Sequence, residues 1–212
     1  MPEIDGNINK DLNYASLCQS AYDGKPDFQG LNKNARAYLG TVNGFPTICF
    51  PGSKTGLDWF YDLLAIPALE LDSFAHIKLG LMPLGFLTAV DDIRQHIKIP
   101  DGNYNVCGHS LGGVMATIYA ALQTIDGRPP TEVVTFDAPR GLSPLGEYAL
   151  KKIAVRQYRF GLDVVSLVPT HPYVHAREPL IQVGNPIISA DLVRDNHKIQ
   201  NFIDLWSGKD ES

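Results

Sequence analysis

Residues 104–122 read YNVCGHSLGGVMATIYAAL, and this stretch decides how the rest of the chain is interpreted. It begins with a short apolar run, Tyr104 to Cys107, that is typical of a buried strand, and a helical pattern follows from Val114 to Leu122. The turn between them contains the pattern Gly-x-Ser-x-Gly, with Ser110 at its centre. A strand, a glycine-bounded turn and a helix in this order predict a serine that projects from the end of the strand.

Strand-like and helical patterns alternate on both sides of this stretch. A helical face in residues 11–22 precedes two strand-like runs, 35–42 and 45–50, and the Asn43-Gly44 dipeptide between these runs favours a tight hairpin turn. Further patterns are helical at 57–64, 85–97, 145–152 and 197–206, and extended at 74–79, 133–136, 155–160 and 180–183. Strands separated by helices predict an α/β fold, in which a mostly parallel central sheet has helices on both faces and an N-terminal hairpin.

The bulk composition is that of an ordinary folded protein. Of the 212 residues, 44% are hydrophobic and 19% are charged, and no repeat or linker divides the chain, so we expect one domain over residues 1–212. The formal charge is −5 and the basic residues are scattered, which argues against a nucleic-acid partner. We also expect no transmembrane segment, because no apolar run is long enough to span a bilayer.

The number and positions of the cysteines indicate whether the compartment is oxidising or reducing. Cys18, Cys49 and Cys107 cannot all pair within one chain, and the last two lie in apolar runs, so we expect reduced core residues. The first ten residues are polar and lack the apolar stretch of a secretion signal. These observations favour the cytoplasm or another reduced compartment.

A serine hydroxyl is a poor nucleophile until a base removes its proton, so the turn predicts a histidine and a carboxylate near Ser110. On folds with this turn, the order along the chain is serine, acid, histidine. His171, His175 and His197 satisfy this order. His197 is favoured because it follows the last strand-like run and opens the terminal helical pattern. The other two are expected to line a loop or the substrate cleft.

Two aspartates follow strand-like runs between the serine and the histidine. Asp163 comes after the run 155–160 and a Gly161 turn, and Asp137 comes directly after the run 133–136. Either carboxylate would emerge at the edge of the sheet where the serine projects. We favour Asp163 as the acid and keep Asp137 as the alternative.

The reaction also needs donors for the negative charge that develops on the substrate oxygen. The backbone N–H of Leu111, directly after the serine, is expected to be one donor. Ser53, in the Pro51-Gly52-Ser53 loop after the run 45–50, is expected to supply the other from its backbone or its hydroxyl.

Five segments in this order resemble the class three lipase family, the fungal-type lipases and their relatives. They are Phe50 to Ser53 with Asp58, Trp59 and Asp62; Gly85-Phe86; Gly108 to Gly113; Thr135 to Arg140; and Asp163 to Pro169. The resemblance covers about residues 11–206. It implies an α/β-hydrolase fold and a serine carboxylic-ester hydrolase, a lipase or esterase that acts on acyl lipids or related small esters without a cofactor or metal. It also implies a catalytic triad and an oxyanion hole, which are Ser110, Asp163 and His197, and Ser53 with Leu111.

The chain departs from the family pattern at two positions: Pro51 stands where arginine is usual, and Asp137 stands where glycine is usual. Only residues 64–73 are available for an amphipathic lid, so small or soluble esters rank equally with triacylglycerol. Apolar residues in 63–71 and 164–174 are expected to form the acyl pocket. Two alternatives stay open: a non-catalytic scaffold that binds a ligand or partner, and the same chemistry on a thioester, amide or polysaccharide acyl ester.

Overall fold

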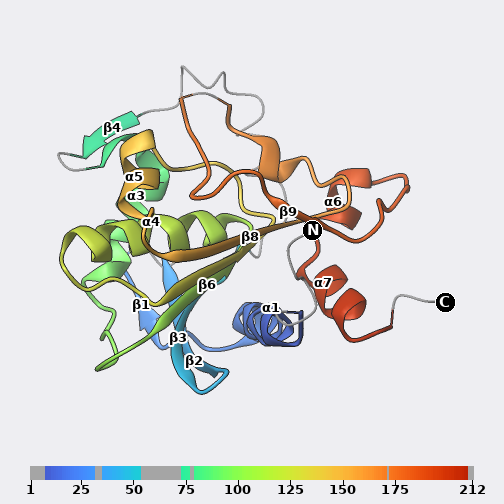
Figure 1. Ribbon diagram of the computed structural model, residues 1–212, viewed down its shortest axis with the longest axis horizontal. Coiled ribbons are helices and arrows are strands. Elements are labelled where there is room, and N and C mark those ends of the chain that lie inside the picture. Colours follow the sequence, from blue (N-terminus) through green and yellow to red (C-terminus); the bar gives the residue numbers. More distant parts are fainter. Residues whose placement is uncertain (1–7, 32–34, 54–72, 77–78, 171, 210–212) are drawn as a thin grey trace.

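A seven-stranded sheet with helices on both faces forms the centre of the computed structural model (Figure 1). The structure describes residues 8–31, 35–53, 73–76, 79–170 and 172–209. In spatial order the strands are β1 (Phe28–Gln29), β2 (Arg36–Val42), β3 (Phe45–Phe50), β6 (Asn105–His109), β7 (Glu132–Phe136), β8 (Ala154–Phe160) and β9 (Ile181–Val183). β2 is antiparallel to both of its neighbours, β1 and β3, whereas β3, β6, β7, β8 and β9 are parallel to one another. The predicted α/β fold with a mostly parallel sheet is therefore confirmed.

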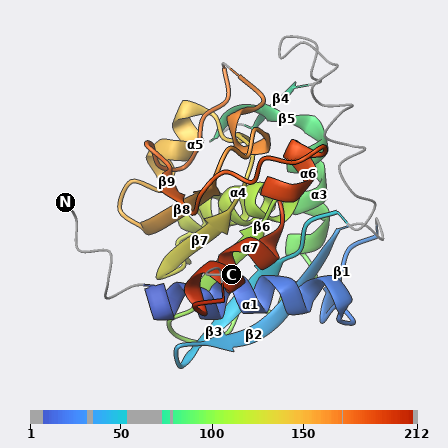
Figure 2. The same ribbon diagram turned by 90° about the vertical axis from the view of Figure 1, so that its right-hand side faces the viewer.

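The helices form a layer on each face of the sheet (Figures 1 and 2). On one face lie α3 (Leu84–Arg94), α4 (Leu111–Ile125) and α5 (Pro144–Ala149), and on the other lie α1 (Ile8–Asp23) and α7 (Ile199–Trp206). Two short helices, a 3₁₀ turn at Val165–Leu167 and α6 (Leu192–Asn196), follow the parallel strands β8 and β9. Among the described residues, no helix has the length and apolar character needed to cross a membrane.

The hairpin at the start of the sheet forms as predicted. Asn43 and Gly44 join β2 to β3 with φ angles of 52° and 84°. Positive φ at both central residues matches the twist of the two strands, and Asn-Gly is the dipeptide that adopts it most readily. This turn fixes the register in which Val42 pairs with Phe45.

Each face of the sheet buries its own apolar core because side chains alternate along a strand. Ile48 and Val106 point toward α3 and α4, whereas Cys49 and Cys107 point toward α1 and α7. Cys18 of α1 joins them, with its sulfur 3.7 Å from that of Cys49 and 3.9 Å from that of Cys107. All three cysteines are free and buried, which confirms that they are core residues.

Some predicted elements differ from the structure. The part of the predicted extended run 74–79 that the structure describes lies apart from the sheet: β4 (Ser73–His76) pairs with β5 (Gly80–Pro83) in a separate antiparallel ribbon. The helical pattern at 197–206 is interrupted, because α6 ends before His197 and α7 begins after Lys198. The predicted helix at 57–64 and residues 64–72 of the possible lid lie outside the described residues.

A buried network of charges attaches α1 to the sheet, away from the turn that carries Ser110. Arg156 of β8 binds Asp11 of α1 at 2.7 Å and Glu132 of β7 at 2.9 Å. Lys10 also binds Glu132, at 3.0 Å. Asp11 was not predicted to face inward, yet it is fully buried. Its burial is tolerated because the arginine neutralises it and donates two hydrogen bonds to it.

We expect the Arg156→Met variant to lose about 3–5 kcal/mol in its free energy of unfolding, because Asp11 and Glu132 would remain buried without their shared cation. Urea denaturation followed by circular dichroism measures this difference. Arg94→Met is the matched control, because Arg94 also binds two carboxylates, Asp91 and Asp126, but at the surface. The control should lose about 1 kcal/mol or less. Equal losses in the two variants would contradict the importance of burial here.

Candidate active site

Ser110 occupies the sharp turn between β6 and α4. Its φ angle is 58°, a left-handed conformation that non-glycine residues adopt mainly where the surrounding structure enforces it. The surrounding structure does so here: the Ser110 N–H donates to the carbonyl of Phe136 at 2.9 Å, and the Gly113 N–H donates to the carbonyl of Ser110 at 2.9 Å. The turn therefore holds the serine side chain at the carboxyl end of the sheet.

Close backbone contact around the turn explains why glycines flank the serine. A Cβ atom on Gly112 would lie 2.0 Å from the carbonyl oxygen of Phe50, at the end of β3. A Cβ atom on Gly108 would lie 2.3 Å from the carbonyl oxygen of Gly112. Any side chain at either position would push α4 away from the sheet and move the serine with it.

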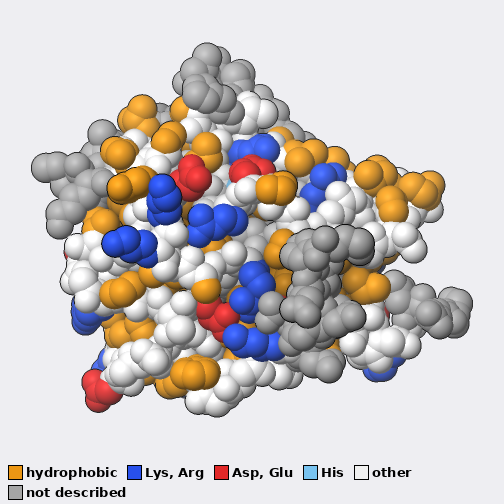
Figure 3. Space-filling model, in the orientation of Figure 1, with side chains coloured by type: hydrophobic (Ala, Val, Ile, Leu, Met, Phe, Trp, Pro, Cys, Tyr) orange, Lys and Arg blue, Asp and Glu red, His pale blue; other side chains and the backbone are white. Residues whose placement is uncertain are grey.

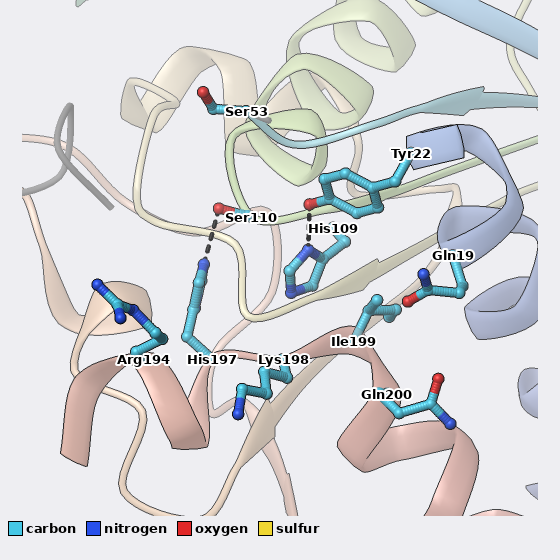
Figure 4. A pocket seen from close by; sticks show the side chains of 10 residues that line it. All are labelled: Gln19, Tyr22, Ser53, His109, Ser110, Arg194, His197, Lys198, Ile199 and Gln200. Carbon is cyan, nitrogen blue, oxygen red and sulfur yellow. Dashed lines mark hydrogen bonds between the residues drawn. The ribbon is translucent and has the colours of Figure 1, made fainter. Parts of the chain in front are cut away.

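Ser110, His197 and Asp163 form one continuous hydrogen-bonded line (Figure 4 shows its first bond). Ser110 Oγ lies 2.7 Å from His197 Nε2, and His197 Nδ1 lies 3.1 Å from Asp163 Oδ2. With the imidazole neutral and its proton on Nδ1, the serine donates to the histidine and the histidine donates to the aspartate. All three side chains are buried. The structure thus brings together the three residues that the sequence pattern singled out.

His197 owes its position to the break between α6 and α7. It caps α6, where its N–H donates to the carbonyl of Val193 at 3.1 Å. The adjacent Asn196 is fully buried, and its amide oxygen accepts from the N–H groups of Leu162 and Ile187. Asn196 thus links two segments: the one that contains His197 and the loop after β8. The sequence pattern did not single out this residue, although an asparagine beside a candidate base is a usable signal.

Asp137, the alternative acid, lies close to this line but does not pair with His197. Its carboxylate is within 4.8 Å of ring nitrogens of His109 and His197, and no hydrogen bond joins it to either of them. Instead, Asp137 Oδ1 accepts the N–H of Phe160 at 2.8 Å. The hydrogen bond to His197 therefore favours Asp163 over Asp137 as the acid.

The other histidines that follow or adjoin the serine occupy supporting positions. His109 is buried, with its ring centroid 5.0 Å from that of His197, and its Nδ1 lies 2.6 Å from Tyr22 Oη. Burial, with the neighbouring His197, lowers the pKa of His109 well below its usual value, so its ring is neutral. His175 donates from Nε2 to the carbonyl of Ser166 at 2.7 Å, and burial lowers its pKa to about 4. His171 lies outside the described residues.

The two predicted oxyanion donors lie on either side of the serine. Leu111 is the first residue of α4, so its N–H has no acceptor within the helix, and the positive end of the helix dipole is directed at the site. Ser53 lies across from Ser110, in the loop after β3 (Figure 4). Tyr22 supports this loop, because its hydroxyl is hydrogen-bonded to the backbone of Gly52 as well as to His109. Tyr22 was predicted only as part of a helical face.

The serine opens into a cavity of about 400 Å³. Its described lining is Gln19, Tyr22, Ser53, His109, Ser110, Arg194, His197, Lys198, Ile199 and Gln200. The lining includes two amides, Gln19 and Gln200, and two cations, Arg194 and Lys198 (Figure 4). The described residues of 164–174 do not line this cavity, and residues 63–71, the other part of the expected acyl pocket, lie outside the described chain.

Two groups of described residues bring three potential metal ligands within 4.8 Å of one another: Cys18, Cys49 and Cys107, and His109, Asp137 and His197. The three thiols lie in the apolar core between α1 and the sheet. In the second group, both ring nitrogens of His197 already have protein partners. The arrangement around Ser110 therefore suits acyl transfer by an activated hydroxyl.

Comparison with solved structures finds fungal lipases of the same fold. A Rhizomucor miehei triacylglyceride lipase superimposes with a TM-score of 0.63 and 19% identity, over 81% of this chain and 78% of that one. Lipase II from Rhizopus niveus gives a TM-score of 0.64 and 18% identity, over 84% and 80% of the two chains. A Rhizomucor miehei lipase propeptide complex gives 0.60 and 17%, and there the match spans 81% of this chain but only 65% of the other.

Comparison by sequence identifies the family. No curated protein matches the sequence significantly. Residues 47–173, more than half of the chain, match the family model described as Lipase (class 3). The matched segment contains the serine turn and the loop that carries Asp163. The chain therefore belongs to the class 3 lipase family and is a carboxylic ester hydrolase with the α/β-hydrolase fold.

Proposed function

We propose that the protein hydrolyses carboxylic esters through an acyl-enzyme formed on Ser110, with His197 as the general base and Asp163 as the acid that orients it. The observation that carries the proposal is the line of two hydrogen bonds, 2.7 Å and 3.1 Å long, that joins the three side chains. Geometry of this kind activates a hydroxyl that is otherwise unreactive.

In the first half of the reaction, His197 Nε2 accepts the hydroxyl proton while Ser110 Oγ attacks the carbonyl carbon of the ester. Asp163 stabilises the imidazolium that results. The negative charge moves to the carbonyl oxygen, and the proposed donors to it are the backbone N–H of Leu111, at the start of α4, and Ser53, in the loop near Ser110. His197 then gives its proton to the leaving alcohol, and the carbon–oxygen bond breaks.

In the second half, a water molecule takes the place of the alcohol. His197 removes a proton from the water as the oxygen attacks the acyl carbon, and the same two donors receive the negative charge. The proton returns to Ser110 Oγ as the acid product leaves, so the enzyme is restored. Each atom and proton is accounted for by these residues and water.

The side chains that line the cavity indicate what kind of ester it could bind. Its described lining combines apolar surface from Tyr22 and Ile199 with the polar side chains of Gln19, Gln200 and Lys198. A wall of this kind suits the alcohol part of an ester, or a small polar ester as a whole, as well as it suits an acylglycerol. Small soluble esters and acyl lipids are therefore both proposed as substrates. A non-catalytic scaffold is disfavoured, because ligand binding alone does not require a serine hydrogen-bonded to a buried histidine–aspartate pair.

We expect the Ser110→Ala variant to lose at least about a thousandfold in kcat on p-nitrophenyl esters, because the nucleophile is removed while the fold is kept. A series of esters with increasing acyl length, assayed for wild type and variant, gives both this loss and the preferred chain length. Circular dichroism should show the same secondary structure for both proteins. Equal slow hydrolysis by the two proteins would favour the non-catalytic scaffold instead.

We expect Tyr22→Phe to lower kcat by roughly tenfold with little change in KM, because the loop that carries Ser53 loses its hydrogen bond through Gly52 and its link to His109. Steady-state kinetics on the best ester of the series measures the two constants separately. The matched control is Tyr148→Phe, which removes the same hydroxyl from an exposed tyrosine on α5. A similar effect of both substitutions, or a change in KM alone, would argue against an effect on the transition state.

A further inference from the structure

Asp137 is an unusual residue beside the proposed acid of the triad. It follows β7 directly, its side chain is fully buried, and its φ angle is 47°. A left-handed conformation in a non-glycine residue is unfavourable, and burying an ionised carboxylate without a partner is more so. Both features occur together at one position in the active site, which calls for interactions that compensate for them.

The two oxygens of Asp137 differ in their surroundings. Oδ1 accepts the N–H of Phe160 at 2.8 Å. Oδ2 is buried, and among the described residues no donor reaches it. A buried acceptor without a donor is destabilising, and more so if it is charged. Oδ2 therefore fits its surroundings poorly as part of a carboxylate.

The neighbour of Asp137 that can resolve this mismatch is Asp163. The two carboxyl groups are close enough to share a hydrogen bond, which exists only when one of them carries a proton. Asp163 already uses both of its oxygens as acceptors: Oδ1 accepts the N–H of Val165 at 3.1 Å, and Oδ2 lies 3.1 Å from Nδ1 of His197. The shared proton therefore belongs to Asp137.

We propose that Asp137 is a positioning residue of the active site: as a neutral carboxylic acid it donates a hydrogen bond from Oδ2 to the carboxylate of Asp163, and it thereby holds that carboxylate against His197. This inference deepens the proposed function and rests on it, since Asp163 matters for turnover only if His197 is the base. Asp137 itself does not touch the reacting atoms.

The charges around Asp137 agree with a neutral side chain. Burial raises the pKa of Asp137 well above its usual value, and the nearby carboxylate of Asp163 raises it further. The titratable and charged groups that face it are Asp163 from the loop after β8, Arg159 from β8, His109 from β6, His197 from the α6–α7 junction and Tyr22 from α1. Arg159 favours the ionised form, but its effect on Asp137 is smaller than those of burial and of Asp163, and its Nε donates to the backbone carbonyl of Asp163.

The hydrogen bond has a definite effect on the pH dependence of turnover. It disperses part of the negative charge of Asp163 and so weakens the attraction between that carboxylate and an imidazolium beside it. Without the donor this attraction is stronger, and the acidic limb of the kcat/KM profile is expected to move up. If Asp137 were ionised, removing its charge would instead move that limb down, because a negative neighbour of the imidazolium would be lost.

Asp137→Asn and Asp137→Gly form a matched pair for this test, because asparagine and glycine both tolerate the positive φ angle. Only asparagine keeps a donor at the position of Oδ2 and an acceptor for Phe160. We expect the acidic limb to stay in place in the Asn variant. In the Gly variant it should rise by roughly half a pH unit or more, and kcat/KM at the optimum should fall by about tenfold. A downward shift of the limb in the Asn variant would overturn the proposal.

Infrared difference spectroscopy tests the proton without relying on turnover. The wild type at neutral pH should show the C=O stretch of a protonated carboxylic acid, which Asp137→Asn should remove. The same measurement in the Ser110→Ala background should give the same band, so a failure of the proposed esterase activity would be recognised separately. Absence of that band in wild type would also overturn the proposal, even if the Gly variant failed to fold.

Discussion

The parallel register of β6, β7 and β8 is the constraint on which the site depends. His109 pairs with Phe136, and Phe136 pairs with Tyr158, so the three strands reach the same edge of the sheet together. The next residues continue the ladder: the N–H of Ser110 donates to Phe136, and the N–H of Asp137 donates to Tyr158. Residues far apart in the sequence therefore emerge side by side, and only His197 has to be delivered from outside the sheet.

Buried carboxylates are stabilised in different ways at the two ends of the sheet. At the amino end of β7, beside the start of α1, Asp11 and Glu132 are matched by two cations, Arg156 and Lys10, so that each of these charges has a partner. At the catalytic end, Asp137 and Asp163 lie together, and Arg159 reaches the backbone of Asp163 with its Nε instead of a carboxylate. A shared proton replaces the missing cation there. Figure 3 shows that the exposed charges on one face, by contrast, are interspersed with apolar side chains.

The sequence predicts the parts of the site that are set by local pattern. The strand–turn–helix pattern locates Ser110, and the chain order of the fold favours Asp163 and His197, which the hydrogen bonds then bring together. Tyr22 and Asn196 escaped prediction because their partners are distant in sequence and mostly backbone groups. The interruption of the helix at His197 was not predicted, because the apolar spacing of 197–206 has the period of one continuous helix. The spacing gives no sign that His197, between α6 and α7, is part of the site.

The position of Asp137 shows why an apparent departure from the family pattern need not disturb the site. Glycine, the residue that the family resemblance leads one to expect there, adopts a positive φ angle freely, whereas aspartate does so at a cost of about 1–3 kcal/mol. The side chain offsets that cost by accepting the N–H of Phe160, a group that glycine would leave to water or to another partner. Its second oxygen gains a partner in Asp163 only when it is protonated. The left-handed backbone, the buried carboxyl and the proposed proton are thus linked, because the hydrogen bonds of the side chain offset the cost of the backbone conformation and the second of these bonds requires the proton.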